Sequence, residues 1–160
     1  MMPSTYPAPR KNVLLLSCMD LRLLDDIVRF MHRDNLANRY DQFILAGSSL
    51  GANLHGAWNE VFFQHIETAV ELHGIQDVYI LEHRHCGAYE KFLGDEGTFD
   101  DSTEDQKKEQ ELHKIHAVEL AKRIHSWSDA HQYTLNVRTL LMDLRGEVSI
   151  LEYLPASPNV

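Results

Sequence analysis

VLLLSCMDLR, residues 13–22, opens with an uninterrupted apolar run and then turns abruptly polar. A short apolar run without alternation is typical of a strand that is buried on both faces of a parallel sheet. Cys18, Asp20 and Arg22 follow at two-residue intervals, so in an extended segment their side chains project to one side. Ligands of such sheets bind beyond the carboxyl ends of the strands. The stretch therefore predicts a parallel sheet with a functional site at the end of this strand.

The rest of the sequence alternates between short apolar runs and segments whose apolar residues have helical spacing. Further strands are predicted at 40–47, 77–83, 134–143 and 147–153, the last two joined by LRG as a hairpin. Helices are predicted at 23–35, at 59–74 and from 102 to 126. This order predicts an α/β fold with a mostly parallel central sheet, flanked by helices and closed by a C-terminal hairpin. We expect residues 1–11 to form an extended N-terminal arm and residues 12–160 to form a single domain.

Composition narrows the classes of partner. The 160 residues carry a net charge of −9, which argues against a nucleic-acid partner because such surfaces are basic. No apolar run approaches the ~20 residues that cross a bilayer, which predicts no membrane partner. The N-terminal stretch lacks the apolar core of a signal peptide, so we expect a cytoplasmic location. With 44% hydrophobic residues, the composition is that of a globular protein.

The chain has two cysteines: Cys18 ends the strand predicted at 12–18, and Cys86 follows the strand predicted at 77–83. EHRHCGAY, residues 82–89, adds His83 two residues before Cys86. Two cysteines and one histidine form a recognised zinc set when a fourth position stays open for catalysis. The alternative is a pair of inert buried thiols, since cysteine is often buried without function. His85 is a nearby alternative to His83 as the histidine ligand.

Asp20 and Arg22 follow the candidate ligand Cys18 directly. An arginine beside an aspartate keeps the carboxylate ionised and oriented. An ionised carboxylate at this place could accept a hydrogen bond from a metal-bound water or bind the metal itself. The alternative is a surface ion pair, which would contribute little to stability.

Together, Cys18-x-Asp20-x-Arg22 and His83-x-x-Cys86-Gly87 resemble the motifs of the β-class carbonic anhydrases. The resemblance covers roughly residues 12–153, including the βα order and the terminal strand–turn–strand. It implies that Cys18, His83 and Cys86 bind Zn²⁺, and that Asp20 and Arg22 are catalytic. It further implies a zinc lyase that reversibly hydrates CO2 to bicarbonate with a metal-bound hydroxide. By the same resemblance we expect a homodimer or a multiple of dimers.

One segment departs from the family pattern. ILAG, residues 44–47, stands where the family commonly has Arg-Asn-Ala-Gly. Apolar Ile44 and Leu45 keep two alternatives open: a carbonyl sulfide or carbon disulfide hydrolase that uses the same site, and a catalytically silent zinc-binding relative. A sulfur analogue of CO2 therefore stands beside CO2 and bicarbonate as a small-molecule substrate.

Two other segments receive a plain interpretation. His113 and His116 are three residues apart on a predicted helix, but no third ligand is evident, so we expect surface or partly buried residues. The acidic stretch at 94–111 has no apolar stripe until its end. We interpret it as a solvated loop that leads into an exposed helix start.

Overall fold

The structure is a computed structural model that describes residues 12–156, so the predicted arm at 1–11 lies outside the described residues. Its strands are β1 (Val13–Ser17), β2 (Tyr40–Ile44), β3 (Asp77–His83), β4 (Asn136–Met142) and β5 (Val148–Leu154). Its helices are α1 (Leu24–Arg33), α2 (Ser49–Leu54), α3 (Gly56–His73), α4 (Gly87–Leu93) and α5 (Thr103–Ala130), with a short 3-10 helix η1 (Gly94–Gly97). In this part of the chain, no helix has both the length and the apolarity to cross a bilayer.

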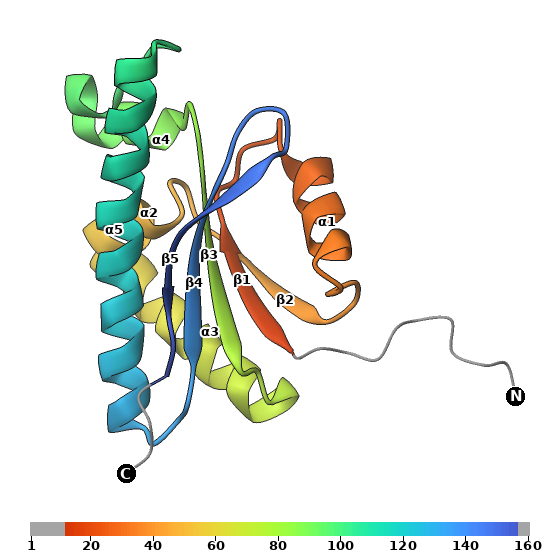
Figure 1. Cartoon of the computed structure of the whole chain (residues 1–160). Helices are drawn as coiled ribbons and strands as arrows, with labels where there is room; N and C mark the ends of the chain where they lie inside the picture. Colours follow the sequence, from red (N-terminus) through yellow and green to blue (C-terminus); the bar gives the residue numbers. More distant parts are fainter. Residues whose placement is uncertain (1–11, 157–160) are drawn as a thin grey trace, which may run out of the picture.

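The strands form one five-stranded sheet in the order β2-β1-β3-β4-β5. β1 to β4 pair in parallel, and β5 pairs antiparallel with β4 as the predicted hairpin. Figure 1 shows α1 on one face of the sheet and α2, α3 and α5 on the other. The predicted α/β fold, with a mostly parallel sheet flanked by helices and a terminal hairpin, is confirmed.

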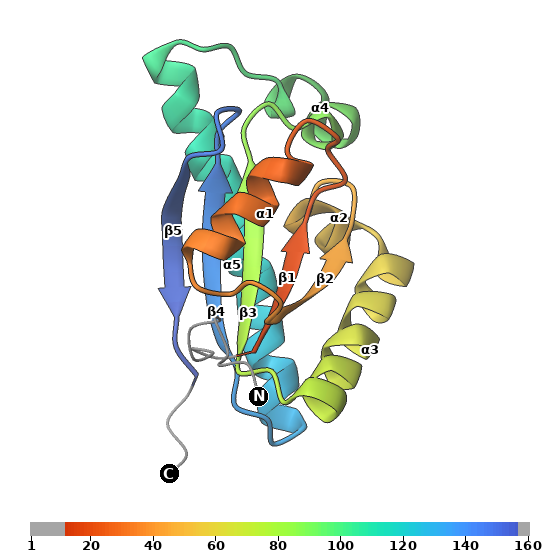
Figure 2. The ribbon, with the colours of Figure 1, turned by 90° about the vertical axis from the view of Figure 1, so that its right-hand side faces the viewer.

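The apolar run of β1 is continuous because the strand is covered on both faces. Leu14 and Leu16 belong to the core beneath α3 and α5, whereas Val13 and Leu15 belong to the core beneath α1. All four side chains are at most 2% exposed. Figure 2, which views the molecule from the side of α1, shows this helix lying across the sheet.

Two short helices, α2 and α4, were not predicted from the sequence. They have six and seven residues, too few for an apolar period to stand out. The start of α5 agrees with the expectation, because the Oγ of Ser102 caps the helix by accepting from the N–H of Asp105 at 3.1 Å. The helix continues to Ala130, four residues beyond the predicted end at 126.

The sheet register places the ends of three strands side by side. Ser17, the last residue of β1, pairs with Ile44 of β2 on one side and with Leu81 of β3 on the other. Cys18 therefore leaves the sheet next to the end of β2, while β3 continues for two residues to His83. The carboxyl edge of the sheet thus gathers the segments that the sequence singled out.

Candidate metal centre

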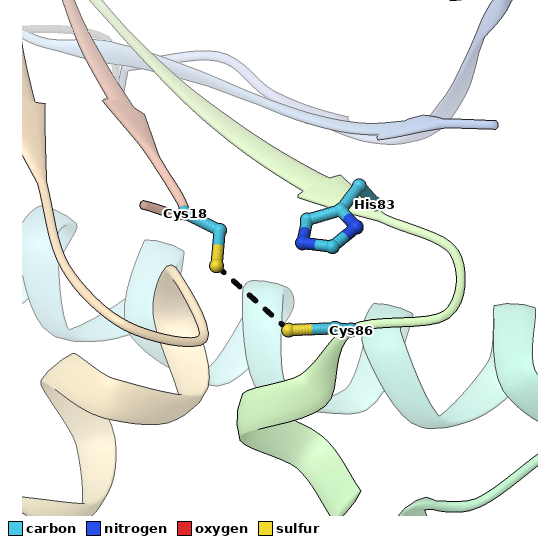
Figure 3. A group of neighbouring side chains, drawn as sticks. All are labelled: Cys18, His83 and Cys86. Atoms are coloured by element: carbon cyan, nitrogen blue, oxygen red, sulfur yellow. Dashed lines mark hydrogen bonds between the residues drawn. The ribbon is translucent and has the colours of Figure 1, made fainter. Parts of the chain in front are cut away.

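Cys18, His83 and Cys86 come together at the carboxyl edge of the sheet. Figure 3 shows their side chains turned toward one space from the end of β1, the end of β3 and the start of α4. One ligand atom from each residue lies within 4.8 Å of the others, and the two Sγ atoms are 3.9 Å apart. His83 and Cys86 are buried and Cys18 is half-buried. The group could hold a metal ion.

The imidazole of His83 has a fixed orientation. Its Nδ1 lies 2.8 Å from the carbonyl oxygen of Arg84, and because a carbonyl can only accept, Nδ1 carries the proton. The Nε2 atom is buried and has no hydrogen-bond partner among the described residues. A buried nitrogen without a partner is costly, and a metal ion in this space would remove the cost. The hydrogen bond at the second ring nitrogen is the usual way in which proteins orient a histidine ligand.

The two thiols influence each other's ionisation. A hydrogen bond with Cys86 lowers the pKa of Cys18 to about 4, against the effect of burial and with help from His83. The same contact with Cys18 raises the pKa of Cys86, because a second negative charge beside the first is unfavourable. The backbone N–H of Gly47 also donates to the Sγ of Cys18 at 3.3 Å. Both thiols can ionise together once a divalent cation lies between them, so this donor set fits zinc.

The predicted pair of Asp20 and Arg22 forms a bidentate salt bridge. Arg22 donates from Nε to Oδ1 at 3.0 Å and from Nη2 to Oδ2 at 2.5 Å, and its backbone N–H donates to Oδ1 at 2.9 Å. These hydrogen bonds lower the pKa of Asp20 to about 2. Oδ2 of Asp20 lies 3.6 Å from Nε2 of His83. An ionised carboxylate therefore stands at the edge of the ligand cluster, and the pair is not a remote surface contact.

His85 does not join the ligand cluster. Its Nε2 lies 2.7 Å from Oδ1 of Asp101, and the described group that could hold a metal contains His83 in its place. The backbone of His85 has φ +55°, a left-handed conformation that is uncommon outside glycine. The alternative of His85 as the histidine ligand finds no support in this arrangement.

Two buried glutamates near the cluster were not predicted. Glu82 immediately precedes His83 and is 1% exposed. It accepts hydrogen bonds from the hydroxyl of Tyr89 and, at 3.1 Å, from the backbone N–H of Ser49, and it lies 3.1 Å from Nδ1 of His113. Burial opposes its ionisation, but these contacts outweigh burial and lower the pKa of Glu82. A charged residue inside an otherwise apolar strand was the available signal.

Glu109 is the second buried glutamate, and it lies on α5. It is 1% exposed and accepts at 2.8 Å from Nε of Arg84 and at 2.8 Å from the backbone N–H of His85. The stretch at 94–111 is largely exposed as expected, but the expectation of a solvated segment is wrong at this residue. No local pattern marks it, because its partners are 24 and 25 positions away.

The remaining predicted residues have different surroundings. His113 is 1% exposed and so is more deeply buried than expected, whereas His116 is half-buried. Neither belongs to a group of side chains in residues 12–156 that could hold a metal. Of the altered pair at the end of β2, Leu45 is partly buried and packs against the core beneath α3 and α5, whereas Ile44, the last residue of the strand, is 47% exposed.

Three solved structures to which the fold of this chain is similar are β-carbonic anhydrases. One of two tetrameric enzymes from Sordaria macrospora has a TM-score of 0.60 and 15% identity, covering 89% of this chain and 81% of that one. The Coccomyxa enzyme in complex with acetazolamide has a TM-score of 0.61 and 15% identity, over 92% and 75%. An enzyme from Aspergillus fumigatus has a TM-score of 0.62 and 18% identity, over 94% and 78%. The chain therefore has the β-carbonic anhydrase fold, as the sequence motifs predicted.

Comparison with other protein sequences shows the family to which the chain belongs. It belongs to the same protein family as an uncharacterized protein of Rickettsia bellii, to which it is 32% identical over 148 residues, covering 91% of this chain and 85% of that protein. An uncharacterized protein of Rickettsia conorii is 36% identical over 87 residues, covering 53% of this chain and 47% of that protein. No known family model matches the chain.

Proposed function

We propose that the chain binds zinc through Cys18, His83 and Cys86 and catalyses the reversible hydration of CO2 to bicarbonate. The observation that carries the proposal is the convergence of the three ligand atoms within 4.8 Å, with Nε2 of His83 buried and unpaired among the described residues. Zinc, when bound, lowers the pKa of a water molecule and so supplies a nucleophile near neutral pH.

Asp20 is suited to orient that water. Its Oδ2 lies 3.6 Å from Nε2 of His83, so a carboxylate oxygen borders the space that the ligand atoms share. At a pKa of about 2, Asp20 is ionised at neutral pH and accepts hydrogen bonds without donating one. Arg22 engages both carboxylate oxygens, which fixes the direction in which Asp20 presents its remaining lone pairs.

The choice of CO2 over a sulfur analogue rests on the surroundings of the altered pair. Leu45 is partly buried and packs against the core beneath α3 and α5, so of the two residues Ile44 is the exposed one at the end of β2. A single changed side chain at this edge is a smaller departure than the two that the sequence implied. The β-carbonic anhydrase fold and the Asp20–Arg22 contact favour CO2 as the substrate.

The proposal is tested by zinc content and turnover on one preparation. Elemental analysis should give about one zinc per chain, and stopped-flow measurements should detect CO2 hydration. Asp20→Asn should keep the zinc and reduce hydration by about 100-fold or more, the range of a positioned acid–base group. Asp26→Asn, a change at a paired carboxylate of α1, is the matched control and should remain active.

Two outcomes would replace the proposal. Rapid sulfide release from carbonyl sulfide or carbon disulfide, with negligible CO2 hydration, would assign the site to a sulfur substrate. Zinc at full occupancy with turnover of none of the three substrates would indicate a catalytically silent zinc-binding relative.

A further inference from the structure

We propose that Glu109 is a positioning residue that sets the geometry of the metal ligands and of the Asp20–Arg22 pair through the backbone of His85. The inference rests on the zinc site of the proposed function and assigns a role to a residue outside it. Glu109 is contributed by α5 (Thr103–Ala130), whereas Cys18, His83 and Cys86 come from β1, β3 and the start of α4.

Both carboxylate oxygens of Glu109 accept hydrogen bonds from the segment between His83 and Cys86. Oε1 accepts from Nε of Arg84 at 2.8 Å, and Oε2 accepts from the backbone N–H of His85 at 2.8 Å. The residue is 1% exposed, and a buried carboxylate is expensive unless it is fully paired. The Arg84 side chain is 18% exposed, so the pair is shielded from water and holds its geometry.

The conformation of His85 explains why this support is needed. His85 has φ +55°, and a non-glycine residue in the left-handed region costs ~1–2 kcal/mol. This bend turns the chain from the end of β3 into α4 (Figure 3), so that Cys86 faces back toward His83. The hydrogen bond that the N–H of this strained residue donates to a buried carboxylate stabilises the turn that brings the two proposed ligands together.

The carbonyl group of His85 contacts the Asp20–Arg22 pair. The carbonyl oxygen of His85 accepts from Nη2 of Arg22 at 2.9 Å, and the same Nη2 donates to Asp20. His85 is thus held through its N–H by Glu109 and through its carbonyl by Arg22. Displacement of His85 would therefore move the Asp20–Arg22 pair as well as Cys86.

Asp101 offers a natural comparison, because it contacts the same two residues through their side chains. It lies 2.7 Å from Nε2 of His85 and 3.5 Å from Nη2 of Arg84, but its side chain is 80% exposed. Exposed pairs contribute little, and Asp101 has no recorded hydrogen bond to the His85 backbone among the described residues. Asp101→Asn is therefore the matched control for Glu109→Gln.

The test compares zinc affinity and ligand geometry in the two variants. In Glu109→Gln the amide oxygen can satisfy one donor, but the amide NH2 then faces the other. We expect its zinc affinity, measured by chelator competition, to fall by about 10- to 100-fold, as for other changes behind metal ligands. The visible bands of the Co²⁺-substituted protein, which report the ligand field directly, should shift. Asp101→Asn should leave both measurements within about twofold of wild type.

A purely structural role would give a different pattern. If the metal-free Glu109→Gln protein unfolds more readily while its zinc affinity and Co²⁺ spectrum match the wild type, the inference is wrong. Should Glu109→Gln not fold, Glu109→Asp serves instead: it keeps the charge for Arg84 but is one methylene too short to reach both donors. We expect it to lose zinc affinity too, and unchanged affinity would refute the inference.

The outcome is separable from that of the proposed function. A wild-type protein that binds zinc but does not hydrate CO2 would overturn the proposed reaction, and the affinity comparison would still decide the role of Glu109. A wild-type protein that binds neither zinc nor Co²⁺ would overturn both.

Discussion

Replacement of Arg22 by glutamine should remove the guanidinium hydrogen bonds to Asp20 and raise the pKa of Asp20 toward its ordinary value. Arg22 holds the pKa of Asp20 at about 2, compared with 3.8 for an unperturbed aspartate. At about 1.36 kcal/mol per pKa unit, this difference corresponds to ~2.4 kcal/mol. Since the Arg22 side chain is 46% exposed, solvent screening reduces the contribution to stability to ~1 kcal/mol.

The pH dependence has a definite sign. The pKa of Asp20 is depressed in the folded state, so the stabilisation is fully present above about pH 4 and is lost as the pH falls through about 2. At pH 7 the free energy of unfolding of Arg22→Gln should therefore be ~1 kcal/mol below that of the wild type. This difference should shrink steadily between pH 4 and pH 2.

Urea unfolding of both proteins between pH 2 and pH 7, after removal of metal with a chelator, measures this difference. A ¹³C NMR titration of the Asp20 carboxyl group measures the pKa directly. Arg29→Gln, which breaks the more exposed pair with Asp26 on α1, is the control and should change stability by no more than ~0.5 kcal/mol. The reasoning fails if Asp20 titrates near 3.8 in the wild type, or if its pKa does not rise in Arg22→Gln.

Three further changes test the site and its surroundings. Cys18→Ser and Cys86→Ser should each lose most of the zinc in elemental analysis, whereas His73→Ala, a change at an exposed histidine, should keep it; full zinc in both cysteine variants would exclude the ligand set. His113→Ala should lower the free energy of unfolding by about 1–3 kcal/mol in urea titrations, because it leaves buried Glu82 without the ring nitrogen that lies 3.1 Å from it, and a loss below ~1 kcal/mol would show that Glu82 is satisfied without it. The same His113→Ala protein should retain zinc, since His113 lies outside the ligand cluster.

The sequence indicated that Cys18, His83 and Cys86 lie close together because two regularities combine there. The continuous apolar run at 13–16 predicted β1. Because ligands bind beyond the carboxyl ends of parallel strands, Cys18 and His83, at the ends of two predicted strands, were expected to lie close together. The structure agrees, since Ser17 pairs directly with Leu81. Local pattern and fold-level geometry were sufficient to predict this proximity.

The buried glutamates could not be found in the same way. Glu109 lies in a segment whose composition is that of a solvated helix, and its burial depends on Arg84 and His85 from a different part of the chain. Glu82 is next to a predicted ligand, but its partner His113 is 31 positions away. Burial of a charge is decided by tertiary partners, which a local window of sequence does not contain.

The altered pair at the end of β2, Ile44 and Leu45, illustrates a different limit. In the sequence, Ile44 and Leu45 are two equally apolar residues near the predicted site. Side chains of adjacent residues in an extended chain point to opposite sides, and here one packs into the core while the other is exposed. The chemical character of the two positions was readable from the sequence, but their separation onto two faces required the structure.

The distance along the chain between Cys18 and Cys86 has a consequence for the order of folding. These cysteines are 68 positions apart, and β1 reaches its neighbour β3 only after α1, β2, α2 and α3 have been passed. Long-range pairings of this kind form slowly, because the entropy of closing the intervening loop is lost before the contacts compensate for it. A chain that has assembled only its first strands and helices lacks two of the three proposed ligands, His83 and Cys86. During refolding in the presence of Co²⁺, the rate at which Co²⁺–thiolate absorption appears would therefore report when β3 pairs with β1.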